Sequence, residues 1–294
     1  MRIIISIALL GFIIAPSFAQ INNDGIAYGD NQENTTRTRH ASEYFPKAGD
    51  IAIGFDATPF LNYVGNMFNG ATSNSLNLGD NTLHFRYFLT DFSAARVALR
   101  INSHRDMNAF YLDDQADQAL DPLSRSQVED RRLTFSNNYE LKLGYLMFRG
   151  ENRLRGFFGG DLFLGYEKMR REFEYGNQMT VANTTPLSVT NWNNGNTASQ
   201  ASRIIESTPG SVFNIGLGAV IGAEYYLLPR VCIGVETGLV YGQTFYGQGH
   251  HQREVMVGNN LIKEDFEDSP KSRNRDAFTT FPYTFGNMFL MIHF

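Results

Sequence analysis

Histidines followed by acids are the residues of this chain best suited to acid–base or metal chemistry. His104 precedes Asp106, and the adjacent His250 and His251 precede Glu254. Adjacent imidazoles can bind a transition metal, but a site needs three or four converging ligands, and the sequence does not indicate them. We therefore interpret these residues as solvated side chains in connections between strands. We expect no catalytic residue, no metal site and no cofactor.

A second set of charged residues alternates with apolar ones, which places the charges on one face of each predicted strand. The set comprises Asp56, Arg86, Arg96, Arg100, Glu140, Lys142, Arg155, Asp161, Glu167, Glu224 and Glu236. His84 and His293 share this face by parity. Acids and bases nearly balance, and buried charges are tolerated only when they are paired. We expect an internal salt-bridge network, with an ion path regulated by re-pairing as the alternative.

Eight segments with apolar residues at every second position are the elements that must position these charges. They cover residues 50–60, 81–90, 93–102, 137–148, 153–167, 213–227, 230–242 and 287–294. Short turns alternate with long connections at about 63–79, 104–131, 169–210 and 248–276. This pattern is typical of a membrane-spanning β-barrel, which has short periplasmic turns and long extracellular loops. The sequence predicts an all-β, antiparallel, up-and-down transmembrane barrel of about eight strands.

The last strand carries an apolar residue at every second position up to the final aromatic residue. These residues are Met288, Leu290, Ile292 and Phe294. We expect them to face lipid and to act as a C-terminal signal for insertion by a barrel-assembly machinery. Tyrosines near strand ends are expected in the aromatic belts at the two membrane surfaces. They are Tyr87, Tyr145, Tyr166, Tyr225, Tyr226 and Tyr241.

The first residues have the pattern of a secretory signal peptide. Arg2 precedes an apolar run from Ile3 to Ile14, and Ala19 ends a stretch containing small residues. The run is shorter than the roughly 20 residues of a spanning helix. We expect a signal peptide over 1–19, a periplasmic tail over 20–49 and one barrel over 50–294. The one cysteine, Cys232, has no cysteine partner within the chain and is interpreted as a small barrel residue.

The third long connection is low in charge and rich in Asn, Thr and Ser, and it contains Trp192, the one tryptophan. This composition is typical of a flexible surface loop. An exposed Trp192 among amides is also a candidate contact for a protein or glycan, because aromatic residues are favoured at binding hot spots. The net charge of −5 gives no sign of nucleic-acid binding.

Three stretches of the sequence resemble small outer-membrane β-barrel proteins of the OmpA-barrel, OmpX and OmpW type. They are "YFLTDFSAARVAL", the Gly-rich "GFFGGDLFLGY" and the C-terminal aromatic strand. The resemblance covers roughly residues 50–294. It implies a location in the outer membrane of a Gram-negative bacterium, in contact with outer-membrane lipid.

These observations favour a non-enzymatic outer-membrane protein whose extracellular loops bind an envelope protein or a surface ligand. Three alternatives remain at this stage. The first is a barrel subunit of an outer-membrane assembly or secretion complex. The second is a channel for small solutes, and the third is a lipid-modifying or proteolytic enzyme. Fold alone does not decide among them, because function resides in the loops and sites.

Overall fold

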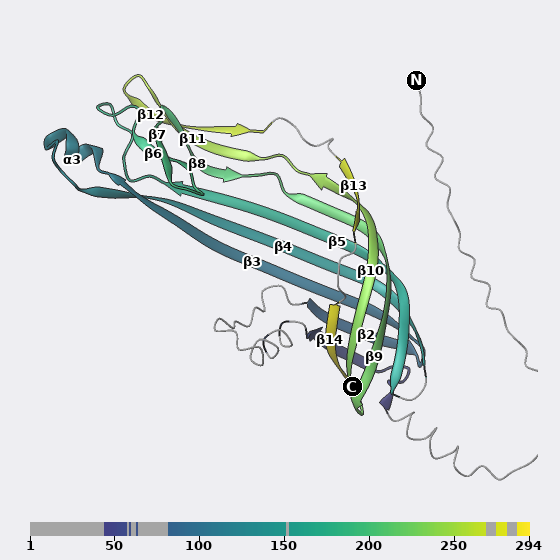
Figure 1. Cartoon of the computed structure of the whole chain (residues 1–294). Coiled ribbons are helices and arrows are strands. Elements are labelled where there is room, and N and C mark those ends of the chain that lie inside the picture. Colours follow the sequence, from purple (N-terminus) through teal and green to yellow (C-terminus); the bar gives the residue numbers. More distant parts are fainter. Residues whose placement is uncertain are drawn as a thin grey trace, which may run out of the picture.

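Eight antiparallel strands close into a ring in the computed structural model, which describes residues 44–57, 59, 63, 82–150, 153–268, 275–280 and 287–294 (Figure 1). The ring strands are β1 (Ile51–Asp56), β2 (Thr82–Thr90), β3 (Ser93–Asp113), β4 (Gln127–Arg149), β5 (Leu154–Glu174), β9 (Val212–Leu228), β10 (Val231–Tyr246) and β14 (Asn287–His293). Each pairs with the next, and β14 pairs with both β10 and β1, which closes the ring. The predicted all-β antiparallel class is confirmed.

The ring forms because its strands alternate between an apolar outer face and a charged or aromatic inner face. In β2, His84, Arg86 and Phe88 are buried, whereas Leu83 and Tyr87 on the other face are about half exposed. Successive side chains of a strand point to opposite faces, so each strand contributes to both walls. Short turns join β2 to β3 and β9 to β10; in the second, Arg230 adopts a left-handed φ of 67°.

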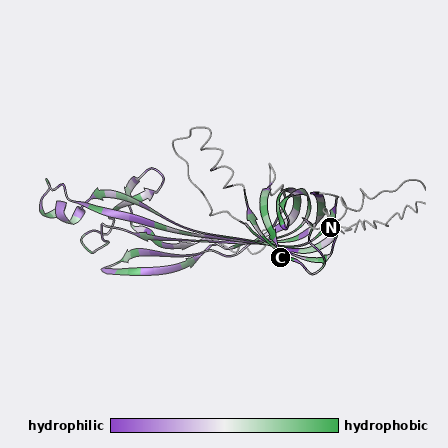
Figure 2. Cartoon of the chain, turned by 90° about the horizontal axis from the view of Figure 1, so that it is seen from below, coloured by the Kyte–Doolittle hydropathy of each residue, from purple (hydrophilic) through white to green (hydrophobic). Residues whose placement is uncertain are grey.

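Three ring strands continue far beyond the ring, and the distal part of the sheet that they build there is here called the extension. The distal halves of β3, β4 and β5 are joined by β8 (Ser202–Thr208), β11 (His250–Val257) and β12 (Asn260–Glu267). Figure 2 shows the strands curling into a ring at one end and flattening into the extension at the other. The strand β13 (Arg275–Thr280) pairs with the distal half of β10.

The prediction of long loops at 104–131, 169–210 and 248–276 was therefore wrong over much of each span. These stretches contain strands, because backbone hydrogen bonds pair β3, β4 and β5 along their whole length. The polar side chains of these strands hide the period-two pattern, and β-structure depends on strand pairing more than on local composition. The predicted connection at 63–79 lies outside the described residues, apart from Tyr63.

Two small elements complete the distal end of the extension. The helix α3 (Gln115–Leu120) joins β3 to β4 and is capped by Asp114, whose carboxylate accepts hydrogen bonds from the backbone N–H groups of Ala116 and Asp117. The strands β6 (Leu187–Asn191) and β7 (Asn196–Ser199) form a separate hairpin. Within the described part of the chain, no helix is long and apolar enough to cross a membrane.

The main core lies inside the ring, at the end where the short turns are found. It is an aromatic cluster that includes Phe88, Phe148, Phe157, Tyr226 and Phe289. The segment Tyr44–Gly49, which we call the closing segment, packs against this cluster: the Phe45 ring lies 5.1 Å from the Tyr226 ring. The closing segment belongs to the predicted tail over 20–49; residues 1–43, with the predicted signal peptide, lie outside the described residues.

One predicted belt residue lies in this core instead. Tyr226 is fully buried inside the ring, whereas its neighbour Tyr225 is 43% exposed on the outside. Adjacent residues of a strand face opposite sides, so both could not have faced lipid. Tyr226 shares its parity with Glu224, and this parity in the sequence already assigned it to the interior.

Candidate functional site

The charged residues predicted to face inward line the ring in layers, and the deepest layer centres on Arg86. The Arg86 guanidinium lies 2.6 Å from Glu224 Oε2, and both side chains are almost completely buried. Tyr226 donates a hydrogen bond of 2.8 Å to the other carboxylate oxygen of Glu224. The Arg86 guanidinium also lies within 5.5 Å of the ring centres of Phe148, Phe157 and Phe289. Both charges are therefore neutralised and hydrogen-bonded, as burial requires.

The middle layer joins three strands through one arginine. Arg96 of β3 donates from Nε to Asp161 of β5 at 2.7 Å and from Nη1 to Glu236 of β10 at 2.8 Å. A second bond joins Arg96 Nη2 to Asp161, which makes that pair bidentate. Gly144 lies beside the pair, and a Cβ there would overlap the Asp161 carboxylate. The glycine is thus required for the close approach of β4 to this ion pair.

A further polar group joins β1, β2 and β14. Asp56 Oδ1 lies 3.0 Å from His84 Nε2, and Asp56 Oδ2 accepts a 3.0 Å hydrogen bond from the Thr82 backbone N–H. Asn287 also donates to the Asp56 carboxylate. These contacts join the buried carboxylate of β1 to both neighbouring strands and satisfy its need for hydrogen bonds.

The charges become more exposed toward the mouth of the ring, at the end where β3, β4 and β5 continue. Arg100 and Glu140 lie 3.4 Å apart with about a quarter of each side chain exposed. Lys142 is buried just below, and Glu167 is exposed. Glu140 and Glu167 line a pocket of about 170 Å³ together with Asn138, Phe163, Gly165, Asn214 and Thr244.

The opposite end of the ring is closed by the closing segment and Arg155. Arg155 Nη2 donates to the Asp91 backbone carbonyl at 2.7 Å, and its guanidinium lies 4.8 Å from the Phe45 ring centre. Arg153 donates to the Tyr44 hydroxyl at 2.7 Å. Nearby, the Cys232 thiol lies 3.4 Å from His293 Nε2 and both are buried. Cys232 is thus a small interior residue, and this end of the ring is filled by side chains.

Trp192 does not have the exposure predicted for a surface contact, because only 9% of it is accessible. The β6–β7 hairpin folds over the inner face of the extension and buries the indole between aromatic rings of β3 and β5. Low charge and many amides obscured this core, since four of its other six members lie outside the hairpin, on β3 or at the end of β5. The six are Phe110, Leu112, Phe173, Tyr175, Leu187 and Val189.

Two buried charged residues hold the hairpin in place. Asp130 of β4 is fully buried and accepts hydrogen bonds from the backbone N–H groups of Gly176 and Val189 at 2.8 and 2.9 Å. Burial raises the pKa of the Asp130 carboxyl, and these two hydrogen bonds only partly oppose the rise. Arg203 of β8 pairs with Glu254 at 2.5 Å and reaches Ser188 of the hairpin at 3.2 Å. Neither residue was expected from the sequence, because both lie in the predicted loops.

The histidines singled out in the sequence lie on strands of the extension, not in loops. His104 and Asp106 are exposed on β3. His250 and His251 do not meet Glu254: they lie 3.2 and 3.3 Å from Glu267 and Asp268. Across the residues that the structure describes, no three His, Cys, Asp or Glu side chains form a group suited to a metal ion.

The C-terminal residues predicted as an insertion signal lie on the outer wall. Ile292 and Phe294 are 40% and 62% exposed, whereas Met288 and Leu290 are partly covered. Through β14 these residues sit at the seam where the last strand meets the first.

Comparison with known proteins assigns no family to this chain. No protein-family model matches it. No curated protein matches it either.

Proposed function

We propose that this chain is an integral outer-membrane β-barrel protein that carries a folded extension on the extracellular side. The observation behind the proposal is that the ring is apolar outside and charged inside, the reverse of a water-soluble protein. Its outer wall exposes large apolar side chains such as Ile51, Leu217 and Ile221, at 50 to 69%. Its interior holds the paired charges. A closed ring has no open backbone edge, and closure is the condition under which strands can cross a bilayer.

Aromatic side chains on the outer wall support a defined depth in the membrane. Tyr139, Tyr166, Phe213 and Phe245 lie in one row across four adjacent strands and share the outer face. We call them the aromatic row. Rings of this kind are favoured at the level of lipid headgroups. On β9, Tyr225 lies about 40 Å from Phe213 at 3.3 Å per residue, which a tilt of about 40° reduces to roughly 30 Å, the thickness of the hydrocarbon core.

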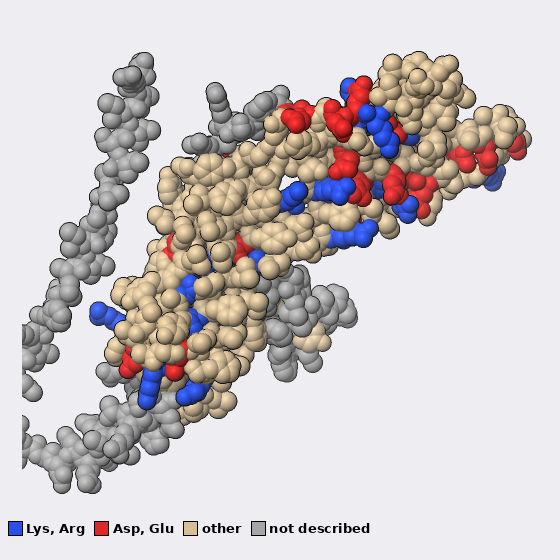
Figure 3. All heavy atoms as spheres, turned by 180° about the vertical axis from the view of Figure 1, so that it is seen from behind, with Lys and Arg blue, Asp and Glu red and all other residues tan. Residues whose placement is uncertain are grey.

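The extension begins just beyond the aromatic row, so the proposed orientation places it outside the cell. In Figure 3 acidic and basic side chains gather over the extension, while the visible wall of the ring is mostly uncharged. The extension is a paired sheet whose distal hairpin has its own core, and it presents a shaped surface rather than free loops. We infer that the protein is non-enzymatic and that the extension contacts lipid, an envelope protein or a surface ligand.

Localisation and topology test the proposal. Expressed in a Gram-negative host, the chain is expected in outer-membrane fractions, with heat-modifiable migration on gels. A protease added to intact cells should cleave extracellular residues, such as Arg125 in the exposed connection after α3, and should leave the ring strands intact. Recovery of folded protein from the soluble periplasm would overturn the proposal.

The C-terminal residue offers a variant with a matched control. Phe294→Asp places a charge on the lipid-facing wall at the seam and should lower the yield of folded protein in the outer membrane. Phe294→Tyr keeps an aromatic ring and should leave that yield close to wild type. Equal yields from both variants would show that the terminal ring has no role in insertion.

A further inference from the structure

The outer wall changes from apolar to charged immediately beyond the aromatic row. On β5, Tyr166 is followed on the same face by Lys168, Arg170 and Glu172. Phe135 of β4 is the register partner of both Arg170 of β5 and Arg105 of β3. Arg105 therefore lies on the same outer face as Arg170, since register partners on adjacent strands share a face. Lys168 and Arg170 thus lie roughly 7 and 13 Å beyond the row, at about 3.3 Å per residue. In the proposed orientation this is the depth of the lipid headgroups.

Two of these cations are available to an anion. Arg105 lies 5.1 Å from the ring centre of Phe135, and both Arg105 and Lys168 are exposed. Among the described residues neither forms an ion pair. Arg170 instead pairs with Glu206 at 2.9 Å and with Glu172 at 2.8 Å. Arg170 therefore positions Glu206, whereas Arg105 and Lys168 are left to neutralise a phosphate.

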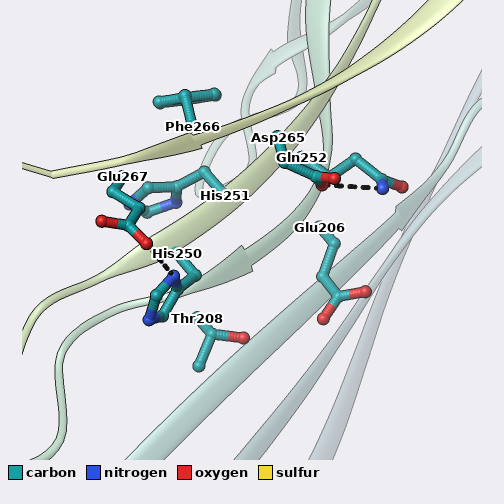
Figure 4. A pocket seen from close by; sticks show the side chains of 8 residues that line it. All are labelled: Glu206, Thr208, His250, His251, Gln252, Asp265, Phe266 and Glu267. Carbon is teal, nitrogen blue, oxygen red and sulfur yellow. Dashed lines mark hydrogen bonds and ion pairs between the residues drawn. The ribbon is translucent and has the colours of Figure 1, made fainter.

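A polar pocket of about 470 Å³ lies on β8, β11 and β12 (Figure 4), and its lining residue Glu206 is paired in register with Glu172 of β5. Its lining residues are Glu206, Thr208, His250, His251, Gln252, Asp265, Phe266 and Glu267. The register of β8, β11 and β12 places all of them except His251 and Phe266 on the outer face, continuous with Arg170 and Glu172. Figure 4 shows the contacts from His250 to Glu267 and from Gln252 to Asp265 that fix two of its walls.

The pocket and the cations suit two parts of one ligand. Three carboxylates in the pocket accept hydrogen bonds from hydroxyl or amino groups and repel a phosphate. Lys168 and Arg105, outside the pocket, attract a phosphate. We propose that this face binds a membrane lipid whose headgroup carries both sugar hydroxyls and phosphates. The proposal rests on the outer-membrane location proposed above, and it names the ligand of the outer wall at headgroup depth.

A binding experiment on the full chain tests this inference. Purified protein in detergent micelles is titrated with bisphosphorylated lipid A, with the dephosphorylated form of that lipid and with phosphatidylglycerol, and complexes are counted by native mass spectrometry. We expect the bisphosphorylated lipid to bind at least tenfold more tightly than either other lipid. Each Lys or Arg near an anionic membrane surface changes the affinity roughly fivefold. Removal of the two phosphates that these cations attract should therefore weaken binding strongly.

Variants separate the two parts of the site. Lys168→Glu with Arg105→Glu should weaken binding of the bisphosphorylated lipid by at least tenfold and leave binding of its dephosphorylated form unchanged. Thr208→Phe, which fills the pocket, should weaken binding of both. Arg125→Glu, a single charge reversal of the same kind at the distal tip, is the control and should change neither. Heat-modifiable migration of every variant shows that each one is folded.

The outcomes are distinct from those of the localisation test. If the wild type is found in the outer membrane but the double charge reversal binds all three lipids as the wild type does, the inference is overturned and the proposed function stands. If soluble glucosamine 6-phosphate binds as tightly as the lipid, the site takes free phosphosugars and the lipid assignment is wrong. If the wild type is absent from the outer membrane, the proposed function fails first.

Discussion

At the scale of single residues, Arg96 is the interior cation whose loss should destabilise the ring most, because it neutralises two buried acids. Replacing Arg96 by Ala leaves Asp161 and Glu236 buried without their shared cation. Breaking a buried pair in this way costs about 3 to 5 kcal/mol of unfolding free energy. Equilibrium unfolding of the protein in lipid or detergent, followed by heat-modifiable migration, measures the loss.

Arg100 is the matched control for this prediction, since it faces the same interior from the same strand. Its pair with Glu140 is longer, at 3.4 Å, and about a quarter exposed. Arg100→Ala should therefore cost less than about 1 kcal/mol. Equal losses in the two variants would show that burial and pairing do not set the contribution of the interior charges.

Asp130 gives a pH prediction at the same scale. Burial raises the pKa of this carboxyl in the folded state, so the folded protein binds a proton more tightly than the unfolded chain. The resulting stabilisation is present at low pH and is lost as pH rises from the ordinary carboxyl pKa through the raised one. The β6–β7 hairpin should thus be held more firmly below this window, and emission of Trp192 on that hairpin reports the change.

The variant Asp130→Asn tests whether this carboxyl is responsible. The amide keeps one acceptor oxygen but cannot accept from both Gly176 and Val189, so the hairpin should be less stable at every pH. Its emission should no longer vary through the carboxyl window. A pH profile that persists in the Asn variant would assign the effect to another group.

At the scale of elements, the ring strands could be predicted from the sequence and the extension could not. Where one face of a strand meets apolar surroundings and the other meets paired charges, alternation marks every residue, as in β2. In the distal half of β3 both faces are largely polar, from His104 to Asn108, and the period disappears. The distal half of β3 is a strand because it pairs with β4, and a local sequence pattern does not reveal that partner.

The hairpin of β6 and β7 is the element for which local composition misled most. Its Asn- and Thr-rich sequence is typical of a flexible loop, yet Trp192 joins a core built by β3 and β5. Trp192→Ala should cost about 3 to 5 kcal/mol of the hairpin's docking free energy. Limited proteolysis is expected to cleave residues 178–200 faster in this variant, while the ring keeps its heat-modifiable migration. Trp192→Phe, which keeps an aromatic ring, should be cleaved more slowly than the Ala variant.

At the scale of the whole molecule, paired charges, an aromatic core and the closing segment fill the ring along its length. Arg96 spans the middle from β3 to β5 and β10, and Arg86 with its three phenylalanine rings occupies the layer below. Arg155 and Phe45 close the end opposite the extension. An eight-stranded ring is only wide enough for side chains to fill, so these layers leave little room for a water column.

The filled interior predicts that the protein does not conduct. Purified protein in planar bilayers should show no sustained current. A chain that lacks residues 20–47 should also stay closed, because the Arg86 and Arg96 layers remain when Tyr44 to Lys47 of the closing segment are removed. A current that appears only in the shortened chain would make the closing segment the gate. A stable large current in the full chain would show that the interior charges rearrange in the membrane. The protein would then be a channel that opens when its interior ion pairs separate, and not a closed support for the extension.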